Sequence, residues 1–187
     1  MYKNCQTEQS AARQRELEQG LLELMLTRRY EDITVSDLCE KMQIPRKAFY
    51  RYFSGKDGAL QALMDHTLIA FYGNPHGKKY QKTGTAVGDL EYFFYFWQEN
   101  SRLIDALQRN ALSGMLFERA VSLAQREQLM PRQLLHWQQD LQSAALSFAI
   151  CGLMAMVIQW HQDGYRISAQ EIASLATSML SRPLLPK

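Results

Sequence analysis

The segment from Thr34 to Phe53 constrains the fold most, because two short helical patterns meet in it without a long connection. Apolar residues recur at helical spacing over 35–42, and Thr34 with Asp37 three residues later has the spacing of a capping box. Ile44-Pro45 then interrupts the pattern, since a residue before proline avoids the α conformation and proline suits a first helical turn. The sequence therefore predicts a helix, a tight turn and a new helix that starts at Pro45.

The second of these helices is aromatic on one side and basic on the other. From Lys41 to Lys56 the chain has five basic residues and no acidic one, although its net charge is only +2. The aromatic side chains of Phe49 and Phe53 share one side of the helix, which leaves Lys47 and Arg51 to point away. A compact helix–turn–helix with a basic second helix fits the major groove of DNA.

Each candidate DNA contact follows from the chemistry of its side chain. Arginine can bond guanine through two atoms, so Arg46, Lys47 and Arg51 are the candidates for reading bases. Hydroxyl groups, lysine ammonium groups and the amides at a helix start can bind phosphate. The predicted DNA-binding residues are Thr34, Ser36, Pro45, Arg46, Lys47, Ala48, Tyr50, Arg51, Tyr52 and Lys56.

The rest of the chain predicts an all-α fold, with a three-helix helix–turn–helix domain at 1–56 and a larger helical domain at 57–187. A stretch rich in glycine and lysine, 73–88, is the linker-like part of the sequence. Apolar periodicity and capping residues predict helices over 10–28, 35–42, 45 onward, 56–72, 87–100, 102–110, 113–128, 131–163 and 168–181.

These residues resemble the TetR family of bacterial transcriptional repressors. The resemblance is carried by the apolar first helix, Tyr30, Thr34-Val35, Leu38, Ile44, Phe49-Tyr-Arg-Tyr-Phe53 and Lys56. It implies phosphate contacts from Tyr50, Tyr52 and Lys56. Two positions depart from the family pattern. Gln43 stands where glycine is common, at a cost of about 1 kcal/mol if the turn is left-handed, and Pro45 stands where serine is common.

One helix–turn–helix unit makes few phosphate contacts, so specific binding predicts a homodimer on a near-palindromic operator in double-stranded DNA. The resemblance implies a four-helix bundle between the two copies, built from the two last helices. Ordinary core within one chain is the alternative for these side chains. The predicted interface residues are Leu146, Ile150, Leu153, Val157, Ile172, Leu175 and Met179.

An aromatic run at 92–97 predicts a binding pocket for a small apolar or aromatic effector in the larger domain. Aromatic and methionine side chains adapt to apolar ligands, although they form ordinary core more often. The predicted pocket residues are Phe93, Phe96, Trp97, Met115, Phe117, Trp137, Phe148 and Met154.

Composition argues against several other classes of protein. Three scattered cysteines fit a reducing compartment, so we expect a cytoplasmic, nucleoid-associated protein. The sequence predicts no metal, no cofactor and no enzyme, because it shows no ligand cluster, nucleophile–base pair or phosphate-binding glycine loop. The apolar run 144–160 is short for a bilayer span, so we expect a buried helix and no membrane partner.

The hypothesis from sequence is a dimeric DNA-binding transcriptional regulator, a repressor that a small effector releases from its operator. The alternative keeps the fold but gives the larger domain a protein partner instead of a small ligand.

Overall fold

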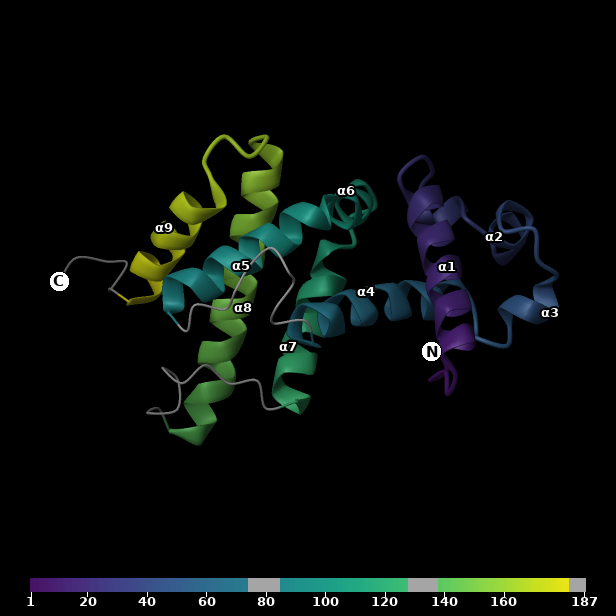
Figure 1. Ribbon diagram of the computed structural model, residues 1–187, viewed down its shortest axis with the longest axis horizontal. Coiled ribbons are helices and arrows are strands. Elements are labelled where there is room, and N and C mark those ends of the chain that lie inside the picture. Colours follow the sequence, from purple (N-terminus) through teal and green to yellow (C-terminus); the bar gives the residue numbers. More distant parts are fainter. Residues whose placement is uncertain (74–84, 128–137, 182–187) are drawn as a thin grey trace. The chain divides into compact units, whose positions relative to one another are not determined.

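The computed structural model describes residues 1–73, 85–127 and 138–181, and it confirms the all-α class over that part of the chain (Figure 1). Contacts divide the chain into two compact units. The first unit is Met1–Ile69 with Arg102–Leu116, and the second is Ala70–Ser101 with Phe117–Lys187. These packing units do not follow the sequence-based boundary at residue 56. That boundary separates functions rather than contacts, and it stays a prediction.

The helices of the first unit are short except for the first and the fourth. They are α1 (Glu8–Met25), the 3-10 turn η1 (Tyr30–Asp32), α2 (Val35–Lys41), α3 (Arg46–Phe49), most of α4 (Lys56–Gly73) and α6 (Ser101–Arg109). The second unit holds α5 (Ala86–Glu99), most of α7 (Ser113–Arg126), α8 (Gln139–Gln162) and α9 (Ala169–Ser181). Within the second unit, α9 packs extensively against α5.

Close approach of α1 and α2 depends on Gly20. A Cβ atom built there would lie 2.4 Å from the Met42 sulfur and 3.2 Å from a Leu38 methyl group. The apolar faces of both helices are buried beside the aromatic pair Phe49 and Phe53, whose ring centres lie 5.2 Å apart. Burying such side chains contributes about 1.5–3 kcal/mol each, and this core fixes the helix–turn–helix.

The turn between α2 and α3 is left-handed at Gln43, whose φ is 52°. The Ile44 N–H donates to the Cys39 carbonyl at 3.0 Å, which closes the end of α2. Gln43 therefore bears the cost of about 1 kcal/mol that glycine would avoid.

Helix α3 is shorter than the sequence predicted. Pro45 is its N-cap rather than its first residue, and no side chain caps it. After Phe49 the Arg51 N–H bonds the Ala48 carbonyl and the Tyr52 N–H bonds the Phe49 carbonyl, both three residues back. The α-helix thus gives way to tighter turns over 50–52.

The η1 connector is held by Lys56 and Asp57 from the start of α4. Lys56 Nζ donates to the carbonyls of Tyr30, Glu31 and Ile33 at 2.7, 3.1 and 2.7 Å, and it lies 4.6 Å from the Tyr30 ring centre. The Tyr30 hydroxyl donates to Asp57 at 2.5 Å, and burial together with that carboxylate holds the pKa of Tyr30 well above its usual range.

Asn110 joins the end of α6 to the same connector. Its amide oxygen accepts from the Tyr30 N–H at 2.5 Å, while its NH₂ donates to Met25 and Ala106 carbonyls at 3.2 and 2.7 Å. This side chain ties α6 to the end of α1, which explains why 102–116 packs with the first unit.

Two sequence expectations for the last helices need correction. The helix predicted over 131–163 is described only from Gln139, and 128–137 lies outside the described residues, as does 74–84 of the predicted linker. The run 144–160 is not a buried helix within one chain: its buried side chains are Leu146, Met154, Val157 and Trp160. The reason is that the rest of the described chain covers one face of α8 only.

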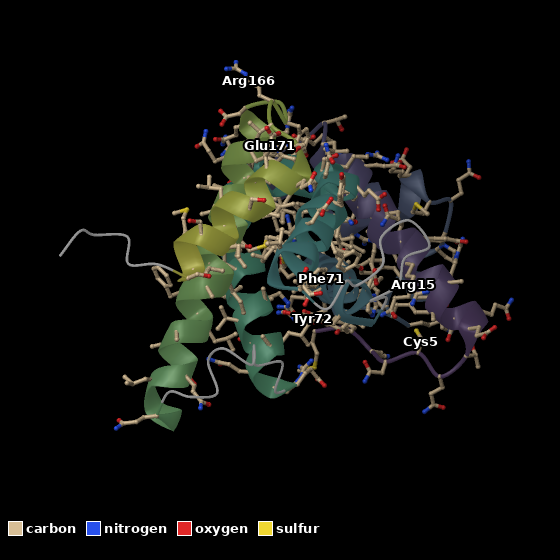
Figure 2. All side chains as sticks on the ribbon, turned by 60° about the vertical axis from the view of Figure 1, so that its left-hand side comes forward. Cys5, Arg15, Phe71, Tyr72, Arg166 and Glu171 are labelled. Carbon is tan, nitrogen blue, oxygen red and sulfur yellow. The ribbon has the colours of Figure 1, made fainter. Side chains whose placement is uncertain are left out.

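The capping box predicted at Thr34 is present, and a second one starts α9. Thr34 accepts from the Asp37 N–H, and the Asp37 carboxylate accepts from the Thr34 N–H and hydroxyl at 2.7 and 2.6 Å. Ser168 and Glu171 form the second box at the start of α9, where Figure 2 labels Glu171.

The cap on α2 predicts a pH-dependent stability. The pKa of Asp37 is held well below its usual range by the Thr34 hydroxyl, then the Thr34 N–H, then Arg28. A lowered folded-state pKa stabilises the fold above the unfolded-state value of about 4, and this is lost as the pH falls. We expect Asp37→Asn to unfold at lower urea concentration than the wild type at neutral pH. The difference should shrink below about pH 4.

Circular dichroism during urea unfolding over a pH series measures this effect. Glu40→Gln removes an exposed carboxylate from the same helix and should change stability by less than about 0.5 kcal/mol. A pH-independent deficit in Asp37→Asn would contradict the electrostatic account.

Candidate nucleic-acid interface

The predicted DNA-binding side chains lie together on the exposed side of α2, α3 and the following turn. Phe49 and Phe53 are buried, so the residues between and before them face solvent. The exposed members of this reading face are Thr34, Ser36, Pro45, Arg46, Lys47, Tyr50 and Arg51, and the half-buried members are Ala48, Tyr52 and Lys56.

Arg46 connects the two helices of this face. Its guanidinium donates a hydrogen bond to the Ser36 hydroxyl in the first turn of α2. A guanidinium has five N–H donors, so this bond orients Arg46 and leaves donors for an acceptor outside the chain. Lys47 on α3 and Arg51 in the turn that follows extend the positive charge of this face.

Acidic charge next to the reading face is balanced by Arg28, a residue that the sequence analysis missed. Asp37 forms an ion pair with Arg28 at 3.0 Å and is the capping partner of Thr34. The negative charge of Asp37 is therefore compensated within the first unit. The hydroxyl and the backbone N–H of Thr34 both donate to Asp37 in this cap. An anion at the start of α2 would therefore have to bind donors other than these two.

Lys56 differs from the other basic residues of the set. An ammonium has three protons, and all three are donated to chain carbonyls. A phosphate would bind Lys56 only by displacing one of these carbonyls. The geometry favours a positioning role for Lys56, because it holds η1 immediately before Thr34. In the sequence, Tyr30 was visible only as one of the residues that carry the family resemblance.

The residues predicted for an effector pocket are partly brought together in the second unit. Phe93, Phe96 and Trp97 lie on α5, and Phe71 at the end of α4 stacks on Tyr92 with ring centres 5.4 Å apart. Figure 2 labels Phe71. Trp97 is almost fully buried, and its indole Nε1 has no hydrogen-bond partner among the described residues.

The other predicted pocket residues are less concentrated. Met154 is buried, Phe148 is 64% exposed, Met115 and Phe117 fall in different packing units, and Trp137 lies outside the described residues. Residues of α1 line two open hollows on the surface, one beside Met42 and the other beside Tyr52. Neither hollow is lined by a predicted pocket residue.

The predicted dimer residues divide into two groups. Leu146, Val157 and Ile172 are buried within the chain, so they serve the core of the second unit. Leu175 and Met179 are 50% and 40% exposed, and Ile150 and Leu153 are half-buried.

Within the described residues, Leu141–Gln162 is long and apolar enough to cross a bilayer by length and composition, with a mean hydropathy of 2.0.

No protein-family model and no curated protein matches the chain. Several solved structures are similar to it, and three of them cover 89–93% of the chain.

The fatty acid degradation regulator FadR from Bacillus halodurans has a TM-score of 0.63 at 12% identity, covering 93% of this chain and 97% of its own. The dihydroxyacetone kinase operon activator DhaS has a TM-score of 0.56 at 17% identity, covering 90% and 93%. AlkX, a TetR family repressor from Dietzia sp. strain DQ12-45-1b implicated in n-alkane biodegradation, has a TM-score of 0.50 at 19% identity, covering 89% and 96%.

At these identities the likeness concerns the fold, and the chain has the fold of TetR-like regulators.

Proposed function

We propose that this protein is a homodimeric DNA-binding transcriptional regulator, a repressor released from a near-palindromic operator by a small effector. The observation that carries the proposal is the reading face. Three basic side chains and several hydroxyl groups are exposed together on α2, α3 and the turn after α3, while Asp37 of α2 is paired with Arg28. Such a face complements DNA phosphates and base edges.

In this proposal α3 enters the major groove. Lys47 and Arg51 point away from the buried aromatic side and read base edges, and Arg46 does so from the anchor that Ser36 provides. The exposed hydroxyl of Tyr50 contacts phosphate. Lys56 acts from behind the face, because it fixes the connector that leads into α2.

Dimerisation is supported by an apolar stripe on α8 that the described chain leaves uncovered. Leu141, Ala145, Phe148, Gly152 and Ala155 follow one another at intervals of four and three residues, and most of them are exposed. Such spacing keeps one helix face toward a partner helix, and the small residues let two backbones approach. A second copy of α8, with Leu175 and Met179 of α9, is the proposed cover.

The effector proposal rests on Trp97. A buried donor without an acceptor costs about 1–3 kcal/mol, and a ligand that brings an acceptor removes this cost. The aromatic residues Phe93 and Phe96 beside Trp97 suit an apolar or aromatic ligand body. Bound effector would shift the dimer toward a conformer whose recognition helices no longer match successive major grooves.

The function is tested first at the reading face, with two lysines that differ in their contacts. An operator is selected from a random DNA pool, and binding is followed by fluorescence anisotropy over a salt series. Lys47→Gln should weaken operator binding by about 1–3 kcal/mol and leave unfolding unchanged. Lys56→Gln should lower the unfolding free energy by about 2 kcal/mol, because three carbonyls lose a charged donor. Unchanged operator binding by Lys47→Gln would remove α3 as the reading element.

Phe148→Glu tests the dimer. Placing a charge in the proposed interface should raise the dimer dissociation constant about a hundredfold or more. Sedimentation velocity measures this, with Ile69→Glu as the control at an exposed apolar position of α4. A Phe148→Glu protein that still sediments as two chains would place the interface elsewhere.

Trp97→Phe tests the effector site. Compounds with an apolar body and a hydrogen-bond acceptor are screened by thermal shift and by release of labelled operator. For a compound that releases operator, Trp97→Phe should weaken binding about tenfold. The matched control is Trp160→Phe, because Trp160 Nε1 already donates to the Ile167 carbonyl at 2.8 Å. Equal effects of the two substitutions would show that Trp97 Nε1 does not bind the effector.

A further inference from the structure

The first residues of the chain pair with the segment that follows the recognition helix. Tyr2 forms an antiparallel bridge with Phe53, and the Lys3 N–H donates to the Tyr52 carbonyl at 2.9 Å. The Ser54 N–H and hydroxyl both donate to the Met1 carbonyl, at 3.0 and 2.8 Å. We name residues 1–5 the strap.

The strap also covers polar groups that are buried on α1. Gln14 is 2% exposed, and its NH₂ donates to the Lys3 carbonyl at 3.0 Å while its oxygen accepts from the Cys5 thiol at 3.2 Å. A buried amide without partners would destabilise the fold. The strap therefore provides hydrogen-bond partners for the polar side chain of Gln14, which lies on the buried, mostly apolar face of α1.

On α4, the strap is held by Tyr2. The Tyr2 hydroxyl donates to Asp65 at 2.9 Å, and its ring meets the edge of His66 with centres 5.5 Å apart. His66 in turn bonds the buried carboxylate of Glu18 at 2.9 Å. The strap thus links α1, α4 and the turn after α3.

Gly58 makes room for the strap. A Cβ atom there would lie 2.3 Å from the Met1 carbonyl oxygen, and the three nearest atoms all belong to Met1. Glycine inside a helix is less favourable than alanine. At this position the missing side chain allows the strap to lie directly against α4.

These contacts matter because Arg51 and Tyr52 do not lie on regular helix. Residues 50–52 form tight turns after the four residues of α3, and only the Phe53 N–H bonds four residues back, to Phe49. Regular helix therefore does not fix the directions of Arg51 and Tyr52. The strap bonds Tyr52 and Ser54 from outside and holds the segment against α4.

We propose that the strap is a positioning element for DNA reading: it fixes the turn after α3 and thereby sets the directions of Arg51 and Tyr52. This proposal rests on the proposed function, since it names residues that orient the reading face.

Two full-length variants loosen the strap without changing an exposed side chain of the reading face. Gly58→Ala pushes on Met1, and Lys3→Pro removes the N–H that bonds Tyr52. Lys3→Gln keeps that N–H but removes the charge. Gly114→Ala is the matched control, since Gly114 also lies in the first turn of a helix of the first unit and has nothing within 4 Å of its Cβ position.

Binding to the operator selected by the wild type and to a scrambled duplex is measured well below the unfolding temperature, with the active fraction taken from stoichiometric titration. Gly58→Ala and Lys3→Pro should each weaken operator binding about tenfold and bind the scrambled duplex nearly as the wild type does. The double variant should lose less than the product of the two factors, because both changes loosen one element. Lys3→Gln and Gly114→Ala should bind as the wild type does.

Amide hydrogen exchange separates this proposal from the proposed function. The Ser54 N–H should lose protection in Gly58→Ala and Lys3→Pro but not in Gly114→Ala. Lost protection with unchanged operator binding would overturn the positioning role. A Lys3→Gln variant as weak as Lys3→Pro, with a salt slope smaller by about one, would also overturn it, because Lys3 would then act through its charge. A wild type that selects no operator would refute the proposed function itself.

Discussion

The ammonium of Lys56 is the interaction on which the geometry of the first unit depends. It donates to the Tyr30, Glu31 and Ile33 carbonyls of the connector between α1 and α2. Because Lys56 begins α4, the start of α4 and the start of α2 are held at one point. The same connector receives Asn110 from the end of α6. Any displacement of α4 or α6 therefore reaches the helix–turn–helix through short, directional hydrogen bonds.

Hydrogen bonds and ion pairs within the chain also determine which charges of the first unit remain exposed. Two carboxylates near the reading face are engaged within the chain: Asp37 with Thr34 and Arg28, and Asp57 with Tyr30. The exposed cations of α3 lie outside these pairs, apart from the Arg46 bond to Ser36. The face that remains is positive although the whole chain is nearly neutral, and this local imbalance favours a polyanion as its partner.

In the second unit, two kinds of group are left without a favourable partner. One is apolar surface on α8 and α9, where Phe148 and Leu175 are exposed to water. The other, among the described residues, is a buried donor without an acceptor, the indole N–H of Trp97. A large apolar partner would cover the exposed surface of α8 and α9, and a small molecule with a hydrogen-bond acceptor would bind the indole N–H. A dimer with an internal ligand provides both partners, whereas a protein partner on α8 would provide the first only.

Much of the fold was readable from sequence because it depends on local rules. Capping boxes, the proline after Ile44 and the helical spacing of apolar residues act within a few positions. Over the described residues the helices they predicted are present, with α3 shorter than expected. The exposure of Arg46, Lys47 and Arg51 followed from the burial of Phe49 and Phe53 on the opposite side. The sequence by itself thus determined the element order, the helix–turn–helix and its basic side.

Tertiary structure decided which polar groups are already occupied. Lys56 looked like a phosphate ligand because its charge is visible in the sequence, but its three acceptors come from residues 23 to 26 positions earlier. Arg28, Asn110 and the strap escaped notice for the same reason: their partners are distant in sequence and close only after folding. The length of α3 and the bare face of α8 likewise depend on what packs nearby, since burial and hydrogen bonding are properties of the assembled chain.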